Sequence, residues 1–186
     1  MQTQKIIIAI TGASGVIYGL RFIEILNQYP KVKSFVIISN AGKDVLNIEI
    51  PDWKDKLKNI KIYSENDLAS PMASGSFLHD GMVIIPCSMA SLAAIANGLA
   101  HNLIHRAADV CLKEGRKLIL VPRETPLNLI HLKNMLNLKQ AGATIIPPCP
   151  NFYTKPKDIL DIVDQIVAKV LDQLGLNHHL ITRWGE

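Results

Sequence analysis

Short runs of apolar residues alternate with helical patterns along most of the chain. The first run, Ile6 to Ile10, contains no polar residue, which is typical of a strand buried on both faces. Similar runs follow at 35–38, 82–85, 118–121 and 144–146, with a weaker one at 60–63. Helical periodicity fills the gaps, at about 15–28, 41–49, 88–99, 103–114, 127–140 and 157–174. This alternation predicts an α/β fold, a doubly wound parallel sheet in a single domain of residues 1–186.

The first predicted strand leads into a turn of small residues, Thr11 to Gly15, before the next helix. The first N–H groups of a helix lack partners within the helix, and the helix dipole favours negative charge beside them. Glycine also lets a ligand approach the backbone closely. We therefore expect residues 12–15 to bind a phosphate. The alternative is a tight strand-to-helix turn that binds no ligand.

Polar side chains follow the other predicted strands as well. Ser39 and Asn40 follow the second strand, the stretch PCSMAS at 86–91 follows the next long one, and Arg123 and Glu124 come after the strand at 118–121. Ligands of open parallel sheets bind beyond the carboxyl ends of the strands. The sequence therefore predicts that hydroxyls, one arginine and one acid meet at one edge of the sheet. The segment 64–81, rich in Ser, Gly, Pro and Asp, is expected to be a long loop.

Several of these residues have an ordinary structural interpretation. Ser39 and Ser88 precede helical patterns, where serine is a good N-cap, and capping is compatible with ligand binding. Arg106 and Lys113 lie on one helix face with Asp109 between them, a spacing that by itself favours surface ion pairs.

Two residues near the C-terminus also have ordinary interpretations. Lys169 flanks an apolar helical stripe, where a lysine usually extends its ammonium group to water. Trp184 lies in the short C-terminal segment, where an aromatic ring usually docks on a core or on a neighbouring subunit.

Composition narrows the functional classes. Of 186 residues, 48% are hydrophobic and 19% charged, so a substantial core is expected. No apolar run approaches the ~18 residues of a membrane span, and no secretory signal is expected at the N-terminus. The net charge of +4 comes without a Lys/Arg run, which favours a small anionic ligand over nucleic acid. Three cysteines without metal-ligand spacing indicate reduced thiols, no metal site and a cytoplasmic protein.

One motif imitates a short-chain dehydrogenase, because the small-residue turn at 11–15 is combined with Tyr153-x-x-x-Lys157. Pro156 inside that spacing would break the helix that such a pair requires. The second strand is also followed by a hydroxyl and an amide rather than by the acid that binds a ribose. The dehydrogenase class is therefore disfavoured.

An ordered set of motifs resembles the UbiX-like flavin prenyltransferases, within the flavodoxin-like flavoproteins. The matching stretches are TGASGVIYGLR at 11–21, SGS at 74–76, PCSMAS at 86–91, NLIHRAADVCLKEGRKLILVPRETP at 102–126, IHLKNML at 130–136, PNFY at 150–153 and RWGE at 183–186. The resemblance implies an enzyme that joins the dimethylallyl group of dimethylallyl monophosphate to N5 and C6 of reduced FMN without a metal. Its product, prenylated FMN, would be the cofactor of a UbiD-type decarboxylase in ubiquinone biosynthesis or aromatic acid decarboxylation.

The resemblance also implies residue roles. FMN would be bound by Gly12, Ala13, Ser14, Ser39, Ser88, Met89, Ala90, Ser91 and Arg123, and the prenyl phosphate by Arg106, Lys113, Arg123, Glu124, Tyr153 and Lys169. The residues expected to act in catalysis are Ser14, Glu49, Lys113, Glu124 and Trp184. Two departures stand out: Lys169 occupies a position where the family typically has arginine, and Met89 and Ser91 lie in a turn that usually reads Ser-Thr-Gly-Thr.

The family resemblance further implies a homo-oligomer, a dodecamer with sites at subunit contacts, and the tail 175–186 is a candidate for reaching a neighbouring subunit. Two alternatives remain. One is a flavin-dependent decarboxylase of the cysteine-decarboxylase type, whose PxMNxxMW motif is replaced here by PMASGS at 71–76. The other is a non-catalytic flavin carrier that serves a partner decarboxylase.

Overall fold

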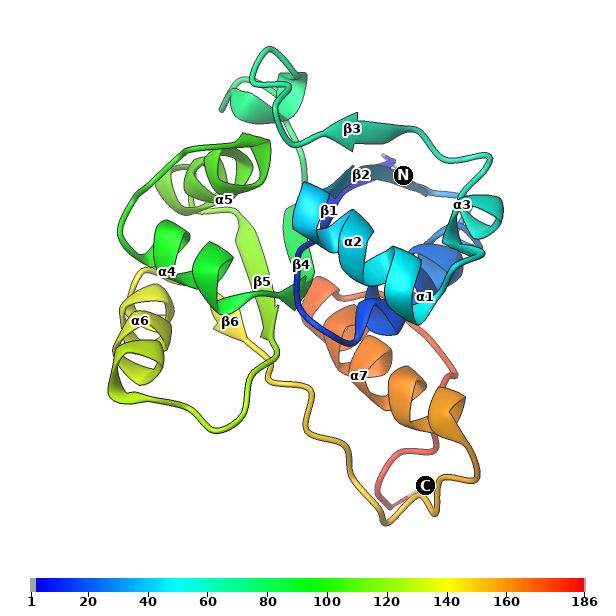
Figure 1. Cartoon of the computed structure of the whole chain (residues 1–186). Helices are drawn as coiled ribbons and strands as arrows, with labels where there is room; N and C mark the ends of the chain where they lie inside the picture. The colour runs from blue at the N-terminus through cyan, green and yellow to red at the C-terminus, as the bar shows by residue number, and fades with distance from the viewer. Residues whose placement is uncertain (1–2, 186) are drawn as a thin grey trace.

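Six parallel strands form one sheet in the order β3-β2-β1-β4-β5-β6 (Figure 1). The computed structural model describes residues 3–185. The strands are β1 (Gln4–Ile10), β2 (Val32–Ile38), β3 (Ile62–Ser64), β4 (Gly81–Cys87), β5 (Lys117–Pro122) and β6 (Thr144–Ile145). Without the short edge strand β3, the order is that of flavodoxin-like sheets. The chain changes direction across the sheet between β1 and β4, so the crevice beyond these two strands is where such folds bind ligands.

Helices cover both faces of the sheet. They are α1 (Val16–Leu26), α2 (Asn40–Glu49), α3 (Trp53–Lys56), α4 (Met89–Ala96), α5 (Leu103–Lys113), α6 (Leu129–Gln140) and α7 (Ile159–Leu174), with a 3₁₀ helix η1 at Pro71–Ala73. In Figure 1, α1 and α7 lie together on one side of the sheet, and α4, α5 and α6 lie on the other. These are the two helical layers that the alternating pattern predicted, and the predicted fold class is confirmed.

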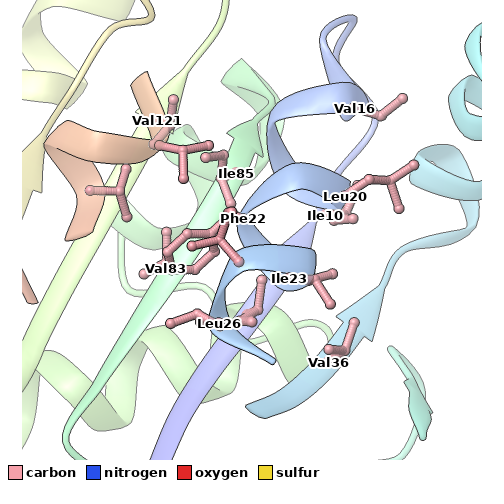
Figure 2. Packing of buried hydrophobic residues seen from close by; sticks show 14 of the residues in the cluster. Ile10, Val16, Leu20, Phe22, Ile23, Leu26, Val36, Val83, Ile85 and Val121 are labelled. Carbon is pink, nitrogen blue, oxygen red and sulfur yellow. The ribbon is translucent and has the colours of Figure 1, made fainter. Parts of the chain in front are cut away.

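The two faces of β1 belong to two separate core clusters. Ile8 and Ile10 pack in the cluster with α1 and α7, whereas Ile7 and Ala9 pack in the cluster with α4 and α5. Both faces are therefore apolar, which explains why the run shows no alternation. Figure 2 shows Phe22 of α1 directed into the first of these clusters. Each fully buried side chain of this size contributes roughly 1.5–3 kcal/mol.

Helix α1 lies unusually close to the sheet at Gly19. A Cβ atom at this position would lie 2.4 Å from the carbonyl oxygen of Ile85 in β4 and 2.8 Å from Cγ1 of Ile10 in β1. No side chain larger than hydrogen fits without a shift of the helix. This contact fixes the distance of α1, and therefore of the turn that precedes it, from the end of β4.

The predicted ends of several helices are wrong, for local reasons. The helix predicted at 88–99 ends at Ala96, because Gly98 adopts a φ of 68°. The helix predicted from 127 begins at Leu129, where Asn128 and His131 form a capping box. The helix predicted from 157 begins after Asp158, whose carboxylate accepts a hydrogen bond from the backbone N–H of Asp161, the third residue of the helix. The short α3 and η1 were not predicted, because three or four residues show no helical period. Within residues 3–185, no helix is long and apolar enough to cross a membrane.

Candidate functional site

The carboxyl ends of the central strands are tied together by short hydrogen bonds. The hydroxyl of Thr11, after β1, donates to the carbonyl oxygen of Pro86 at 2.9 Å and accepts from the backbone N–H of Ser88 at 2.7 Å. The N–H of Ser39, after β2, donates to the carbonyl of β1's last residue at 3.0 Å, and that of Arg123, after β5, donates to the carbonyl of Cys87 at 3.2 Å. The predicted gathering of polar residues at one edge is therefore confirmed for the turns after these four strands.

The serines at this edge cap helices, as their ordinary interpretation predicted. Ser39 Oγ accepts from the N–H of Gly42 at 2.9 Å. Ser88 Oγ accepts from the N–H of Ser91 at 3.2 Å and donates to the Ser91 hydroxyl at the same distance. These bonds fix the hydroxyls at the starts of α2 and α4, where a phosphate would also contact them.

Carboxylates of the chain itself occupy the starts of two other helices. Glu49, at the end of α2, accepts hydrogen bonds from the N–H groups of Gly15 at 3.0 Å and Val16 at 3.2 Å. Glu65 accepts from the N–H of Asn40, the first residue of α2, at 2.7 Å. Among the described residues, no carboxylate contacts the first turn of α4. Of these three helix starts, α4 is therefore the one left for an external anion.

This arrangement bears on the expectation that a phosphate occupies residues 12–15. The N–H groups of Gly15 and Val16 already have an anionic partner, and the glycines of the turn have structural causes. Gly15 has a φ of 92°, and a Cβ on Gly12 would lie 2.5 Å from the Cβ of Ala41. The turn 11–15 stays a candidate wall of the site, but its helix start is not an open phosphate cradle in this structure.

The sequence interpretation missed Glu65. Besides binding the start of α2, its carboxylate accepts from the side-chain amide of Asn102 at 3.0 Å, and Asn102 is the N-cap of α5. Glu65 thus links the starts of two helices at the site's edge. It directly follows β3, so the two residues after the weak strand predicted at 60–63, a serine and this acid, were the signal that could have found it.

Arg123 lies near Tyr18 of α1 at the same edge. Burial raises the pKa of Tyr18, and the nearby positive charge of Arg123 opposes that shift in pKa. Cys149, from the segment after β6, acts electrostatically on the same phenol. Residues after β5 and β6 therefore approach α1. The neighbouring acid, Glu124, is exposed and accepts a hydrogen bond from the N–H of Thr125 at 2.9 Å.

The aromatic residues of the proposed prenyl site meet in space although they are far apart in sequence. The rings of Tyr153 and Trp184 lie edge to face, with centroids 5.0 Å apart and an interplanar angle of 88°. Lys169 lies exposed on α7. Tyr153 and Lys157 both precede α7 and share no helix, which removes the dehydrogenase-like pairing.

Two predicted substrate-binding residues, Arg106 and Lys113, lie on α5 and are paired with neighbouring acids. Arg106 donates through Nε to the carbonyl of Ala73 at 3.0 Å and pairs with Asp109 at 2.6 Å. Lys113 pairs with Glu114 rather than with Asp109, so only half of the ion-pair ladder suggested by the spacing is present. Lys113 ends α5, about 15 Å along the helix from its start at a rise of 1.5 Å per residue.

The end of α5 belongs to the opposite edge of the sheet. Arg116, which follows it, donates to the carbonyl oxygens of Gly75 and Phe77, shortly before β4 begins, and β5 begins at Lys117. Since α5 starts at the carboxyl edge beside Glu65, Lys113 lies toward the amino edge. A single chain therefore does not bring Lys113 together with the turns after β1, β4 and β5.

The C-terminal tail packs on its own chain. The hydroxyl of Tyr29 donates to the carbonyl of Asn177 at 2.7 Å. Asp172 of α7 binds Arg183 at 2.8 Å and His178 at 3.1 Å. The part of the tail described here, 175–185, is thus anchored within the subunit, and its contact with a neighbouring subunit stays a prediction.

The three cysteines are free. Burial raises the pKa of Cys87 and of Cys111 to about 12, so both are unreactive thiols at neutral pH. Cys149 is exposed. In the part of the chain that the structure describes, no group of three His, Cys, Asp or Glu side chains could hold a metal ion.

The comparison with protein families matches residues 1–171 to the model described as Flavoprotein. The chain belongs to this flavoprotein family. A flavin prenyltransferase UbiX from Methanocaldococcus jannaschii is 51% identical over 183 residues, which cover 97% of this chain and 98% of the relative. Within the flavoprotein family, the chain is one of the UbiX-like flavin prenyltransferases.

Two solved structures have the same fold over nearly the whole chain. AnUbiX (PadA1) in complex with FMN and dimethylallyl pyrophosphate has a TM-score of 0.93 and 40% identity, covering 100% of this chain and 99% of its own. A dodecameric FMN-dependent UbiX-like decarboxylase from Escherichia coli O157:H7 has a TM-score of 0.93 and 43% identity, covering 98% of this chain and 100% of its own.

Proposed function

We propose that this protein is a flavin prenyltransferase that joins the dimethylallyl group of dimethylallyl monophosphate to N5 and C6 of reduced FMN. The product, prenylated FMN, would serve as cofactor for a UbiD-type decarboxylase. The observation that carries the proposal is the joined edge of the sheet, where the turns after β1, β2, β4 and β5 meet. Within residues 3–185, the start of α4, unlike those of α1 and α2, has no carboxylate partner.

The residues at this edge suit the binding of FMN. The first turn of α4, with the hydroxyls of Ser88 and Ser91, would hold the flavin phosphate, because helix N–H groups and hydroxyls both donate to it. Ser39 and the turn containing Ser14 would flank the flavin, and Arg123 would add a positive charge. Met89, in the same first turn, would pack its flexible side chain against the ring system.

Other residues of the chain would hold the prenyl donor. When bound, reduced FMN supplies the nucleophile. Breaking the allylic C–O bond leaves negative charge on the phosphate, which Lys169 and the hydroxyl of Tyr153 stabilise by positive charge and by donation. The face of Trp184 steadies the positive charge on the allyl group. Glu49 holds the turn that carries Ser14, through its bonds to Gly15 and Val16.

We further propose that Arg106 and Lys113 serve the site of a neighbouring copy. Both lie on α5, and Lys113, at the end of that helix, lies toward the amino edge of its own sheet, although the resemblance assigns both to the substrate phosphate. The E. coli relative described above is a dodecamer. A homo-oligomer of this kind, a dodecamer here too, would bring Lys113 of one copy to the joined edge of another, where Glu124 would share in binding the phosphate.

The test of function is a mass measurement. The purified protein is mixed with FMN, a reductant and dimethylallyl monophosphate, and the released flavin is weighed. A gain of one C5 unit is expected. A bound flavin of unchanged mass would refute transfer and favour the carrier alternative, whereas loss of CO₂ from a cysteine-terminated peptide without flavin prenylation would favour the decarboxylase alternative.

The shared site has its own test. Lys113→Ala and Arg123→Ala are each expected to lose transfer, and co-expression of the two variants with different tags should yield mixed oligomers. If Lys113 acts in a neighbour's site, some sites in the mixed oligomers contain both intact residues and recover activity. Mixed oligomers as inactive as the separate variants would show that both residues act within one chain.

We also propose that the protein works in the cytoplasm. What supports this location is the state of its cysteines, which are three unpaired thiols in the described chain, as expected in a reducing compartment.

A further inference from the structure

The aromatic pair formed by Tyr153 and Trp184 is held from two sides by helix α7. Gln165 of α7 is 2% exposed, and its side chain accepts from the N–H of Asn151 at 2.7 Å and donates to the hydroxyl of Thr154 at 3.0 Å. These two bonds fix the segment that carries Tyr153. Its position therefore does not depend on the tail.

Trp184 is held differently, through its neighbour Arg183. The guanidinium of Arg183 donates to both oxygens of Asp172, at 2.8 Å and 3.3 Å, a fork-like pairing that fixes direction as well as distance. The same carboxylate binds Nε2 of His178 at 3.1 Å, and the imidazole of His178 is almost fully covered. The side chain of Asp172 thus binds two residues of the tail, His178 and Arg183.

Burial of Trp184 does little to hold its ring against Tyr153. The indole is 80% exposed, so its own burial contributes little. A cavity of about 240 Å³ lies between the two segments, lined by residues of 154–157 on one side and 180–182 on the other. Tyr29 and the packing of Leu176 and Leu180 hold the beginning of the tail, so the ion pair at Asp172 is the contact that fixes the end of the tail beside Trp184.

The spacing along α7 connects this anchor with the proposed substrate site. Gln165, Lys169 and Asp172 stand at positions i, i+4 and i+7, which share one face of a helix. The anchor of Tyr153, the proposed phosphate-binding lysine and the anchor of Trp184 therefore follow one another along one stripe.

We propose that Asp172 is a positioning residue, which anchors the tail through Arg183 and His178 so that Trp184 stands against Tyr153 on the side of α7 that carries Lys169. The proposal deepens the proposed function, because it gives the tail a task at the prenyl-donor side of that site. Removing the carboxylate releases Trp184 and leaves the FMN side, on α4 and β5, unchanged.

The anchor is tested in the free, full-length protein. With Trp53→Phe as background, Trp184 is the one tryptophan of the chain, and Asp172→Ala is expected to lower its fluorescence anisotropy. Because Trp53 is buried and its loss could unfold the protein, hydrogen exchange of the segment 176–185 is measured in parallel without that change, and a rise of about tenfold or more is expected.

Kinetics then test the positioning role. Asp172→Ala is expected to raise the KM for dimethylallyl monophosphate and to lower kcat/KM by roughly 10- to 100-fold, the range of a small misplacement in a site, at unchanged affinity for FMN. Arg183→Ala should act in the same direction, and the double variant should lose less than the sum of the two single losses, because both variants remove the same ion pair. Asp44→Ala, which removes a carboxylate from an exposed position of α2, is the control and should change neither measurement.

The outcomes separate this inference from the proposed function. Unchanged anisotropy and exchange in Asp172→Ala overturn the anchor, as do additive losses in the double variant. A loss of FMN affinity that parallels the loss of transfer overturns the positioning role. Wild-type protein that transfers no dimethylallyl group refutes the proposed function, and the anisotropy and exchange measurements still decide the anchor.

Discussion

Replacing Gly19 by alanine tests whether close contact of α1 with the sheet fixes the site's first turn. The added Cβ would lie 2.4 Å from the carbonyl oxygen of Ile85, whereas ordinary contacts begin at 3.4 Å. Helix α1 must therefore move by about 1 Å, because a backbone oxygen cannot rotate away as a side chain can. Overpacking usually costs about 1–3 kcal/mol, and a clash this close with a rigid backbone atom belongs to the upper part of that range, about 2–3 kcal/mol. The helix propensity of alanine returns about 1 kcal/mol.

We expect Gly19→Ala to lower the free energy of unfolding by about 1–2 kcal/mol, measured by urea denaturation, and the Tm by about 2–8 °C. Affinity for FMN should fall as well, because a displaced α1 carries the turn 11–15 with it. Gly81→Ala is the matched control, since its Cβ would meet the Cβ of Lys117 at 3.2 Å, a contact that a small shift relieves. A Gly19→Ala protein as stable as the wild type would show that α1 can move away from β4 without a loss of stability. That result would refute the claim that this close contact fixes the position of α1.

Three further predictions concern single side chains. Lys169→Arg should lower the KM for dimethylallyl monophosphate several-fold in steady-state assays, since a guanidinium binds phosphate through two donors; a higher KM would place the phosphate elsewhere. Burial lowers the pKa of His79 below 6.5, so between that pKa and 6.5 the unfolded state binds the proton more readily. The free energy of unfolding should therefore fall as the pH drops through 6.5, and His79→Gln should flatten that decline; identical pH profiles would contradict this origin. A thiol reagent at pH 7 should label Cys149 at once, but Cys87 and Cys111 only on unfolding, and mass spectrometry of native protein carrying more than one label would refute their protection.

The sequence by itself determined the fold class and the grouping of polar residues at one edge of the sheet. Strands buried on both faces have continuous apolar runs, as in β1, so the parallel sheet could be predicted from the sequence. Because parallel strands all end at the same edge, the residues after them, such as Ser39, Ser88 and Arg123, were predictable as one group. These are consequences of local pattern and of topology.

Only the tertiary structure shows which backbone N–H groups at the helix starts already have a carboxylate partner. Glu49 binds the start of α1 because the packing of α2 brings the end of that helix there. Glu49 and Gly15 are 34 positions apart in the sequence, and no local pattern indicates this contact. The approach of Gly12 to Ala41 likewise gave a motif glycine a packing role that no pattern shows.

The placement of Lys113 and of the tail was also beyond the sequence. Helical spacing related Arg106 to Lys113, but only the direction of α5 relative to the sheet shows that Lys113 lies toward the other edge. Helix α7 ends with its C-cap Gly175, and the segment between Asp172 and Arg183 has no regular secondary structure after that point. Their pairing therefore depends on the path of the folded chain. Local sequence sets period and turn chemistry over a few residues, whereas contacts between distant segments depend on how whole elements pack.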